Sequence, residues 1–153
     1  MNSFYNNFLA KSKNNWIITA ILSAPVFLLV YFAYKEPRVE IDKKAFKLKG
    51  LYGVNLLFSE IAEVDTIIWR EMPSISVRAN GISFNKVHRG KFITTSDDKI
   101  HLNVHRRVNP IVRIYKQDGS VYYINRKNAD ETRRIFNQLK QNRNGKSKNQ
   151  QSI

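Results

Sequence analysis

The sequence predicts an N-terminal transmembrane helix followed by a mainly β domain that is capped by a C-terminal α-helix. Three observations support this fold class. Residues 16–34 contain no charged side chain, short β-branched and aromatic runs follow from about residue 38, and one amphipathic helical pattern comes last. A chain of 153 residues is long enough for one domain with a core and too short for two.

The apolar run at residues 16–34 has the length and ends expected of a membrane span. As a helix it would extend about 28 Å, close to the roughly 30 Å of bilayer hydrocarbon. Trp16 stands at one end, and Tyr31 and Tyr34 at the other, where interfacial aromatic residues are favoured. A buried core helix is seldom apolar on every side, and the apolar region of a signal peptide is usually shorter. We therefore predict a retained membrane anchor, with residues 1–15 as a short N-terminal tail.

Basic residues near this run predict its orientation. Lys11 and Lys13 precede it, whereas six basic residues follow it closely: Lys35, Arg38, Lys43, Lys44, Lys47 and Lys49. Because Lys and Arg concentrate on the cytoplasmic side of membrane spans, this asymmetry predicts a single-pass protein of the cell membrane with a cytoplasmic C-terminal domain.

The segment after the anchor is typical of an antiparallel β-sandwich or β-barrel, because short strand-like runs recur at eight to twelve residues with turn residues between them. The expected strands are Val39–Ile41, Ala45–Lys49, Val54–Phe58, Ala62–Trp69, Ser74–Ala79, Gly81–Val87, Lys91–Thr95, Ile100–Val104, Ile111–Lys116 and Val121–Asn125.

Four dipeptides predict how these strands connect. Asp118-Gly119 and Asn80-Gly81 favour hairpin turns, since such turns need a positive φ. Asp97-Asp98 offers side-chain acceptors for a turn. Asn109-Pro110 marks the start of a strand, where a missing backbone donor costs least.

A helix is expected to close the domain. Asn128 suits the N-cap position, with Asp130 and Glu131 in the first turn. An apolar stripe should then pack against the sheet; its members are Thr132, Ile135, Phe136 and Leu139. The domain is predicted to cover residues 38–142, and residues 143–153 are polar and basic, which indicates a disordered tail.

Few residues suggest chemistry. There is no cysteine, and the histidines are His88, His101 and His105. On a strand, His101 and His105 would be roughly 13 Å apart, too far to share a metal ion. No nucleophile elbow or phosphate loop is present. The sequence therefore predicts no enzyme, no cofactor and no metal site.

Basic residues are the remaining functional signal, because the formal net charge is +14. Two groups are candidate contacts for lipid or a partner: Lys43, Lys44, Lys47 and Lys49 beside the anchor, and Lys86, Arg89 and Lys91 in a hairpin region. Anionic lipid headgroups, nucleic acid and simple solvation are the alternatives that remain for these charges.

The stretch from Val39 to Leu139 resembles the bacterial pleckstrin-homology-like (PH-like) domain family of membrane-anchored proteins. The matching features are Tyr52-Gly53, Ser59-Glu60-Ile61, Met72-Pro73, Arg78-Ala79-Asn80-Gly81, Gly90-Lys91-Phe92, Asn109-Pro110, Tyr123-Ile124-Asn125 and Glu131-Thr132. The resemblance implies a bent, partly open β-barrel capped by the last helix. Eukaryotic relatives of the fold often bind phosphoinositides through basic residues around the first two strands, a region that here holds the lysines from Lys43 to Lys49.

These observations predict a membrane-anchored PH-like module for binding or scaffolding, without catalytic activity, that contacts anionic lipid headgroups. The first alternative is a tethered protein-interaction domain with no lipid specificity, since peptides can add to sheet edges. The second alternative is a basic nucleic-acid-binding protein, whose binding would depend strongly on salt. The oligomeric state does not follow from the sequence.

Overall fold

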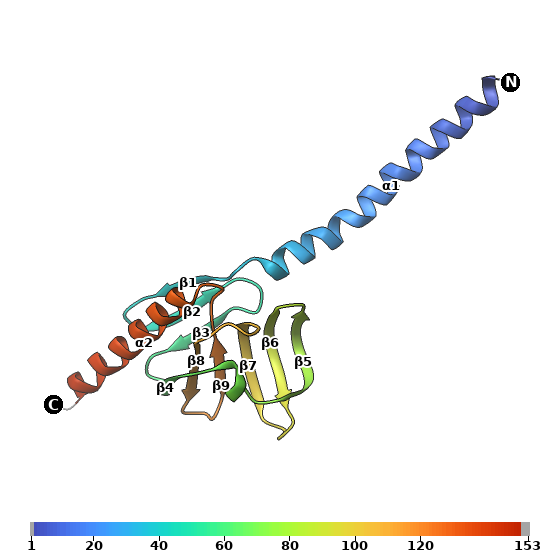
Figure 1. The fold of residues 1–153 in the computed structure, drawn as a ribbon. Helices are drawn as coiled ribbons and strands as arrows, with labels where there is room; N and C mark the ends of the chain where they lie inside the picture. Colours follow the sequence, from blue (N-terminus) through green and yellow to red (C-terminus); the bar gives the residue numbers. More distant parts are fainter. Residues whose placement is uncertain (1, 151–153) are drawn as a thin grey trace. The chain divides into compact units, whose positions relative to one another are not determined.

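The structure is a computed structural model that describes residues 2–150, with side chains described for residues 16–32 and 34–143 (Figure 1). The chain divides into two compact units between Lys35 and Glu36. The first unit consists of helix α1 (Asn2–Tyr34). The second unit begins at Glu36, two residues before the predicted start of the domain, and holds all the strands and helix α2 (Ala129–Gln150).

Helix α1 corrects the prediction of a membrane anchor. Its described side chains cover residues 16–32 and 34, and Thr19, Ser23 and Pro25 interrupt the apolar residues. Within the part of the chain that the structure describes, no helix combines the length and the apolarity that crossing a membrane requires. This finding contradicts the transmembrane helix predicted at 16–34, and with it the predicted single-pass localisation in the cell membrane with a cytoplasmic domain.

A small antiparallel sheet opens the second unit. Its strands are β1 (Arg38–Ile41), β2 (Ala45–Lys49) and β3 (Val54–Leu57), in the order β1-β2-β3. The turn between the first two strands is held by Asp42, whose Oδ1 accepts the backbone N–H groups of Lys44 and Ala45, both at 2.7 Å. The β2 boundaries agree with the sequence prediction.

A second sheet of six strands forms the body of the domain. The strands are β4 (Ile61–Ile67), β5 (Ile75–Phe84), β6 (Val87–Thr94), β7 (Lys99–His105), β8 (Ile111–Lys116) and β9 (Val121–Ile124), in the order β4-β8-β9-β7-β6-β5. A short 3-10 helix, η1 (Trp69–Glu71), follows β4. The mainly β prediction is confirmed. A wholly antiparallel sheet is not observed, because the β8–β9 hairpin lies between β4 and β7 and pairs β9 parallel with β7.

Asn80-Gly81 is not a turn. Both residues lie inside β5, and the chain reverses instead at Asn85, whose φ is 49°. Gly81 stands opposite Gly90 on β6, and a Cβ at Gly81 would lie 2.3 Å from the carbonyl oxygen of Arg89. The glycine therefore permits the close approach of two strands, which is the other common reason for glycine inside a strand. The Asp118-Gly119 hairpin is confirmed, with Gly119 at φ 81°.

Helix α2 begins where the sequence predicts. The Asn128 Oδ1 accepts the N–H of Asp130 at 2.8 Å and so caps the first turn. Thr132, Ile135 and Leu139 are buried, and the helix packs on β4 and β8. The helix continues to Gln150, past the predicted end of the domain at residue 142; residues 151–153 of the predicted tail lie outside the described residues.

The six-stranded sheet separates two hydrophobic clusters. Strand alternation sends Val112, Ile114 and Ile124 to the face covered by the small sheet and α2, and Ile111 and Tyr123 to the other face. The first cluster also contains Phe46, Leu48, Leu56, Phe58, Ile61, Val64, Ile135 and Leu139; the second also contains Ile67, Phe92, Ile100, Leu102 and Val104. The small sheet is therefore held to the large one mainly by burial of apolar surface.

Truncation of Leu139 tests the role of α2 in this core. Leu139 is 0 % exposed, so we expect Leu139→Ala to lower the free energy of unfolding by about 2–5 kcal/mol, from lost burial and the cavity that remains. Urea unfolding of the full chain, followed by tryptophan fluorescence, measures this loss. The control is Gln138→Ala on the exposed side of the helix, with a change within about 0.5 kcal/mol. Equal effects of the two substitutions would contradict the packing of α2.

Candidate ligand pocket between the two sheets

Strand β7 carries a polar row on the face that looks toward the small sheet. Residues at every second position share a face, so His101, Asn103 and His105 lie together, opposite to the apolar Ile100, Leu102 and Val104. On β6, Lys91 pairs with His101, and Arg89 pairs with Asn103. On β9, Tyr122 pairs with His101, and Ile124 pairs with Asn103. Polar side chains from three strands thus meet on one core-facing surface.

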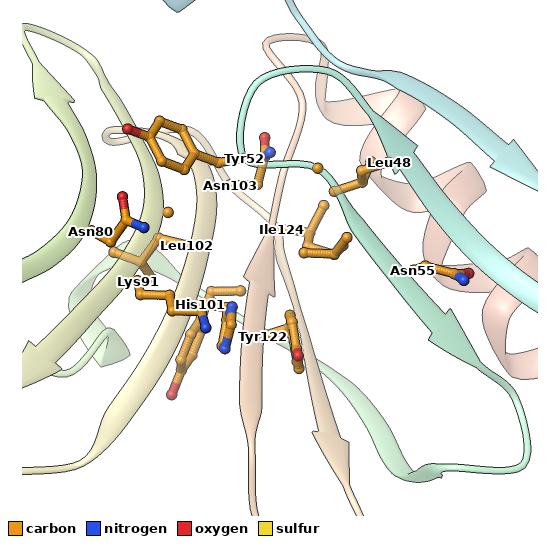
Figure 2. Close-up of a pocket in the computed structure, with 14 residues that line it drawn as sticks. Leu48, Tyr52, Asn55, Asn80, Lys91, His101, Leu102, Asn103, Tyr122 and Ile124 are labelled. Atoms are coloured by element: carbon orange, nitrogen blue, oxygen red, sulfur yellow. The ribbon is translucent and has the colours of Figure 1, made fainter.

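A pocket of about 240 Å³ lies over this row (Figure 2). Its floor comes from β5, β6, β7 and β9, and its opposite wall comes from the end of β2, the turn at Tyr52 and the start of β3. The lining residues are Leu48, Tyr52, Gly53, Val54, Asn55, Asn80, Gly90, Lys91, His101, Leu102, Asn103, Tyr122, Tyr123 and Ile124. Rigid strands therefore supply most of the lining, which favours a preformed cavity.

Asn103 is the unusual residue of this pocket. The residue is buried, at 6 % exposed, and its Nδ2 has no hydrogen-bond partner among the described residues. Leaving a buried donor without a partner costs about 1–3 kcal/mol. Native proteins satisfy nearly all such groups, so an exception calls for an explanation such as a ligand, an ion or a bound water.

Asn125 provides the contrast. It is 1 % exposed, its Oδ1 accepts the N–H of His105 at 2.6 Å, and its Nδ2 donates to the carbonyls of His105 and Val108 at 3.0 Å and 2.8 Å. This amide ties β9 to the end of β7 and to the loop that follows it. A buried asparagine that serves structure alone is thus fully paired in this domain, and Asn103 is not.

His101 and Tyr122 form an aromatic wall. Their rings stack with centroids 4.3 Å apart and planes inclined by 21°. Burial lowers the pKa of His101, and the nearby charges of Lys91 and Lys116 lower it further. Burial also raises the pKa of Tyr122. Near neutral pH the imidazole is therefore uncharged, with one N–H donor, and the phenol keeps its proton.

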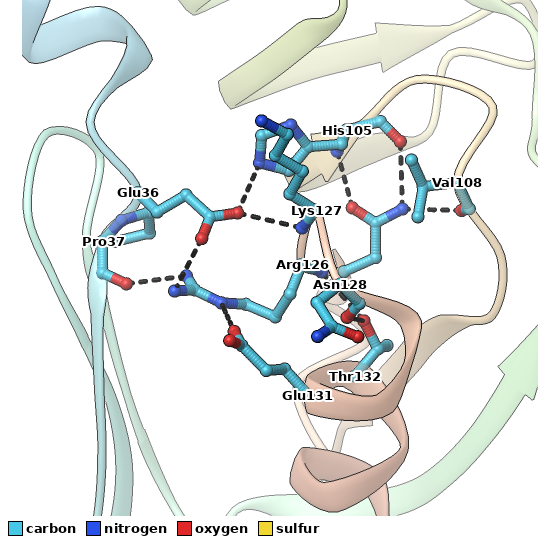
Figure 3. Close-up of polar contacts among 10 residues, drawn as sticks. Glu36, Pro37, His105, Val108, Arg126, Lys127, Asn128, Glu131 and Thr132 are labelled. Atoms are coloured by element: carbon cyan, nitrogen blue, oxygen red, sulfur yellow. Dashed lines mark hydrogen bonds and ion pairs between the residues drawn. The ribbon is translucent and has the colours of Figure 1, made fainter.

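A second polar cluster surrounds Glu36 at the other end of the row (Figure 3). Its Oε1 accepts the backbone N–H of Lys127 at 2.9 Å and lies 2.8 Å from Nε2 of His105, and its Oε2 lies 3.1 Å from Arg126. Arg126 also donates to the carbonyl of Pro37 at 2.7 Å. These contacts fasten the first residues of the domain to the segment just before α2.

The charges of this cluster shift its pKa values. Burial opposes ionisation of Glu36, but the Lys127 N–H, Arg126 and His105 together outweigh it and hold the pKa below 4.5. Burial lowers the pKa of His105, although Glu36 acts in the opposite direction. Burial likewise lowers the pKa of Arg89, which also feels the charges of Glu36 and Arg126. Glu36 therefore interacts electrostatically with two guanidinium groups and a histidine, and Arg126 has a second carboxylate partner in Glu131, at 3.3 Å.

The structure separates the basic residues that the sequence grouped. Lys47 pairs with Asp42 at 3.0 Å, and Lys49 pairs with Glu40 at 2.7 Å, so two of the four lysines in the first group are partly neutralised. The other two, which are Lys43 and Lys44, are exposed in the β1–β2 turn. In the second group Lys86 is exposed in the β5–β6 turn, Lys91 lines the pocket and Arg89 is 1 % exposed. Arg89 therefore offers no surface for a contact.

The remaining sequence candidates are also placed. Trp16, Tyr31 and Tyr34 are exposed on α1, where the predicted membrane interface is not supported. Among the residues that the structure describes, no group of three or more His, Cys, Asp or Glu could hold a metal ion.

The sequence analysis did not identify Asn103, Tyr52 and Asn80 as pocket residues. The signal for Asn103 was its place between His101 and His105, in the polar half of an alternating strand.

No family model, curated protein or solved structure matches this chain. The resemblance to PH-like domains therefore stays a prediction.

The stability of the domain is expected to fall on mild acidification. Burial is the main cause that lowers the pKa of each histidine below 6.5 in the folded protein; these residues are His88, His101 and His105. Below about pH 7 the unfolded chain then binds more protons than the folded one, so the free energy of unfolding decreases as pH falls. Urea unfolding at pH 7.5, 6.5 and 5.5 measures the slope. His101→Gln should make it shallower, and Lys99→Gln should leave it unchanged. Greater stability at pH 5.5 than at pH 7.5 would contradict this expectation.

Glu36→Gln tests the second polar cluster. The substitution keeps the size of the side chain but removes the charge that Arg126 and His105 share, so we expect a loss of about 1–3 kcal/mol in the free energy of unfolding at pH 7.5. Glu63→Gln, at an exposed carboxylate on β4, is the matched control and should change stability by less than about 0.5 kcal/mol. Indistinguishable unfolding curves for the two variants would remove the anchoring role of Glu36.

Proposed function

We propose that the second unit is a binding module, not an enzyme, and that its ligand occupies the pocket between the two sheets. The observation that carries this proposal is the Asn103 amide, a buried donor that lines the pocket without a partner among the described residues. A preformed cavity with apolar walls and a few converging polar groups is the usual form of a small-molecule site.

The lining chemistry suits recognition of a ligand. The titratable side chains of the described lining are amine, imidazole and phenol groups, and no carboxylate stands among them. The His101 ring stacks on the Tyr122 ring, and this contact holds the imidazole in place. The pocket thus holds donors and aromatic surface, and these serve recognition.

Lipid contact, protein interaction and nucleic-acid binding stay predictions of the sequence. The ion pairs of Lys47 and Lys49 reduce the charge that the first lysine group offers to a headgroup. None of those three predictions includes an enclosed pocket. The presence of this pocket favours a ligand that is small enough to fit inside it.

Binding of small aromatic probes tests the proposal. We expect benzoate or benzamide, added to the full ¹⁵N-labelled chain, to shift the backbone amide resonances of Tyr52, Gly90 and Asn103, because these residues line the pocket. Asn80→Trp places a large side chain among the lining residues and should abolish the shifts.

The matched control for this experiment is Ser76→Trp, also on exposed strand β5 but outside the pocket lining. It should leave the probe-induced shifts intact. The proposal fails if neither probe perturbs the pocket resonances, or if both tryptophan variants respond to the probes as the unsubstituted chain does.

A further inference from the structure

We propose that the pocket selects an organic oxyanion, a small molecule that carries a carboxylate or phosphate group on an apolar or aromatic body, and that Lys91 and Asn103 bind the charged group. This inference rests on the proposed function and names the ligand class for the same site.

The first argument is the balance of donors and acids. The described lining offers the Lys91 ammonium, the side-chain amides of Asn80 and Asn103, and the N–H of His101, all of which can donate a hydrogen bond. None of the described lining residues is Asp or Glu. A site with donors and no carboxylate complements a negatively charged ligand that accepts hydrogen bonds. No negatively charged side chain of the described lining would repel such a ligand.

The second argument is the geometry of the two binding residues. Lys91 on β6 stands opposite His101, and Asn103 is two positions along β7 from His101 on the same face. Diagonal neighbours of this kind on adjacent antiparallel strands are about 7–8 Å apart, a distance that a long lysine side chain can span. Figure 2 shows both side chains among the lining residues. A carboxylate or phosphate between them would receive a charged hydrogen bond from Lys91 and would satisfy Nδ2 of Asn103 with its second oxygen.

The third argument is the charge of the lining itself. Among the described lining residues, Lys91 is the one Lys or Arg side chain, and no carboxylate of the lining offsets its positive charge. This charge attracts an anion to the pocket.

The fourth argument is size. About 240 Å³ is below the range of roughly 300–1,000 Å³ that is typical for drug-sized ligands, so the pocket holds a small metabolite-like body. Leu48, Val54 and Ile124 supply apolar walls, and the stacked His101 and Tyr122 supply a flat aromatic one. These surfaces suit a ring or a short hydrocarbon that extends from the charged group.

Titration calorimetry on the full chain tests the charge preference with benzoate, phenyl phosphate and the neutral isostere benzamide. We expect at least one anion to bind about tenfold more tightly than benzamide, because a hydrogen bond to a charged group adds roughly this factor. The comparison of benzoate with phenyl phosphate distinguishes the two kinds of oxyanion. Raising the salt concentration should weaken binding of the anions more than that of benzamide.

Variants locate the effect. Lys91→Gln, at an exposed position, should remove most of the preference for anions and leave benzamide binding intact; Lys99→Gln on the same sheet but outside the lining is the matched control and should change neither. Asn103→Asp keeps the size of the side chain and places a negative charge at the floor, so it should abolish anion binding. If that variant does not fold, the Lys91 result still decides the proposal.

The outcomes separate the two proposals. Benzamide binding as tightly as both anions, or an anion preference that survives Lys91→Gln, overturns the oxyanion class and leaves the binding module standing. Absence of binding by all three probes overturns both.

Discussion

The alternation of strand β7 between two faces is the constraint on which the rest of the domain depends. Ile100, Leu102 and Val104 are buried on one side, so every intervening residue must face the small sheet. The intervening residues are His101, Asn103 and His105, which are all polar. The same face of the large sheet therefore has apolar side chains on β8 and β9 and a polar row on β7. A shift of one residue in the pairing with β6 or β9 would exchange the two sets and destroy both the second core and the pocket.

The polar row is satisfied unevenly along its length. At one end His105 meets Glu36, and the amide of Asn125 closes three hydrogen bonds around the strand end. This end holds the start of the domain, the segment before α2 and the β7–β8 loop in one network. Toward Asn103 the small sheet supplies apolar side chains and a turn but no partner for Nδ2 among the described residues. The change from a closed network to an open pocket occurs within one strand.

Local features of the fold were predictable from sequence, because they depend on neighbours along the chain. The boundaries of β2 and β8, the Asp118-Gly119 hairpin and the Asn128 cap all follow from short patterns. The parallel pairing of β7 with β9 was not predictable in this way, because it depends on where the β8–β9 hairpin packs in the sheet. Asn80-Gly81 misled because a glycine that permits close approach of two strands looks the same in sequence as one in a turn. The membrane prediction was wrong, because no helix in the described part of the chain combines the length and the apolarity that a membrane span requires.

The site was harder to predict than the fold, because charge counts do not report burial. Lys86, Arg89 and Lys91 lie within six positions, yet they occupy a turn, an interior and a pocket. The Coulomb effect of Glu36 favours the charged form of the buried Arg89 guanidinium, and Glu36 also pairs with Arg126. The Nδ2 of Asn103, a buried donor without a partner among the described residues, adds nothing to the stability of the domain, and the Lys91 ammonium lines the same pocket. The combination is understandable if a negatively charged ligand binds there, since the same molecule would accept a hydrogen bond from Nδ2 and offset the charge of Lys91.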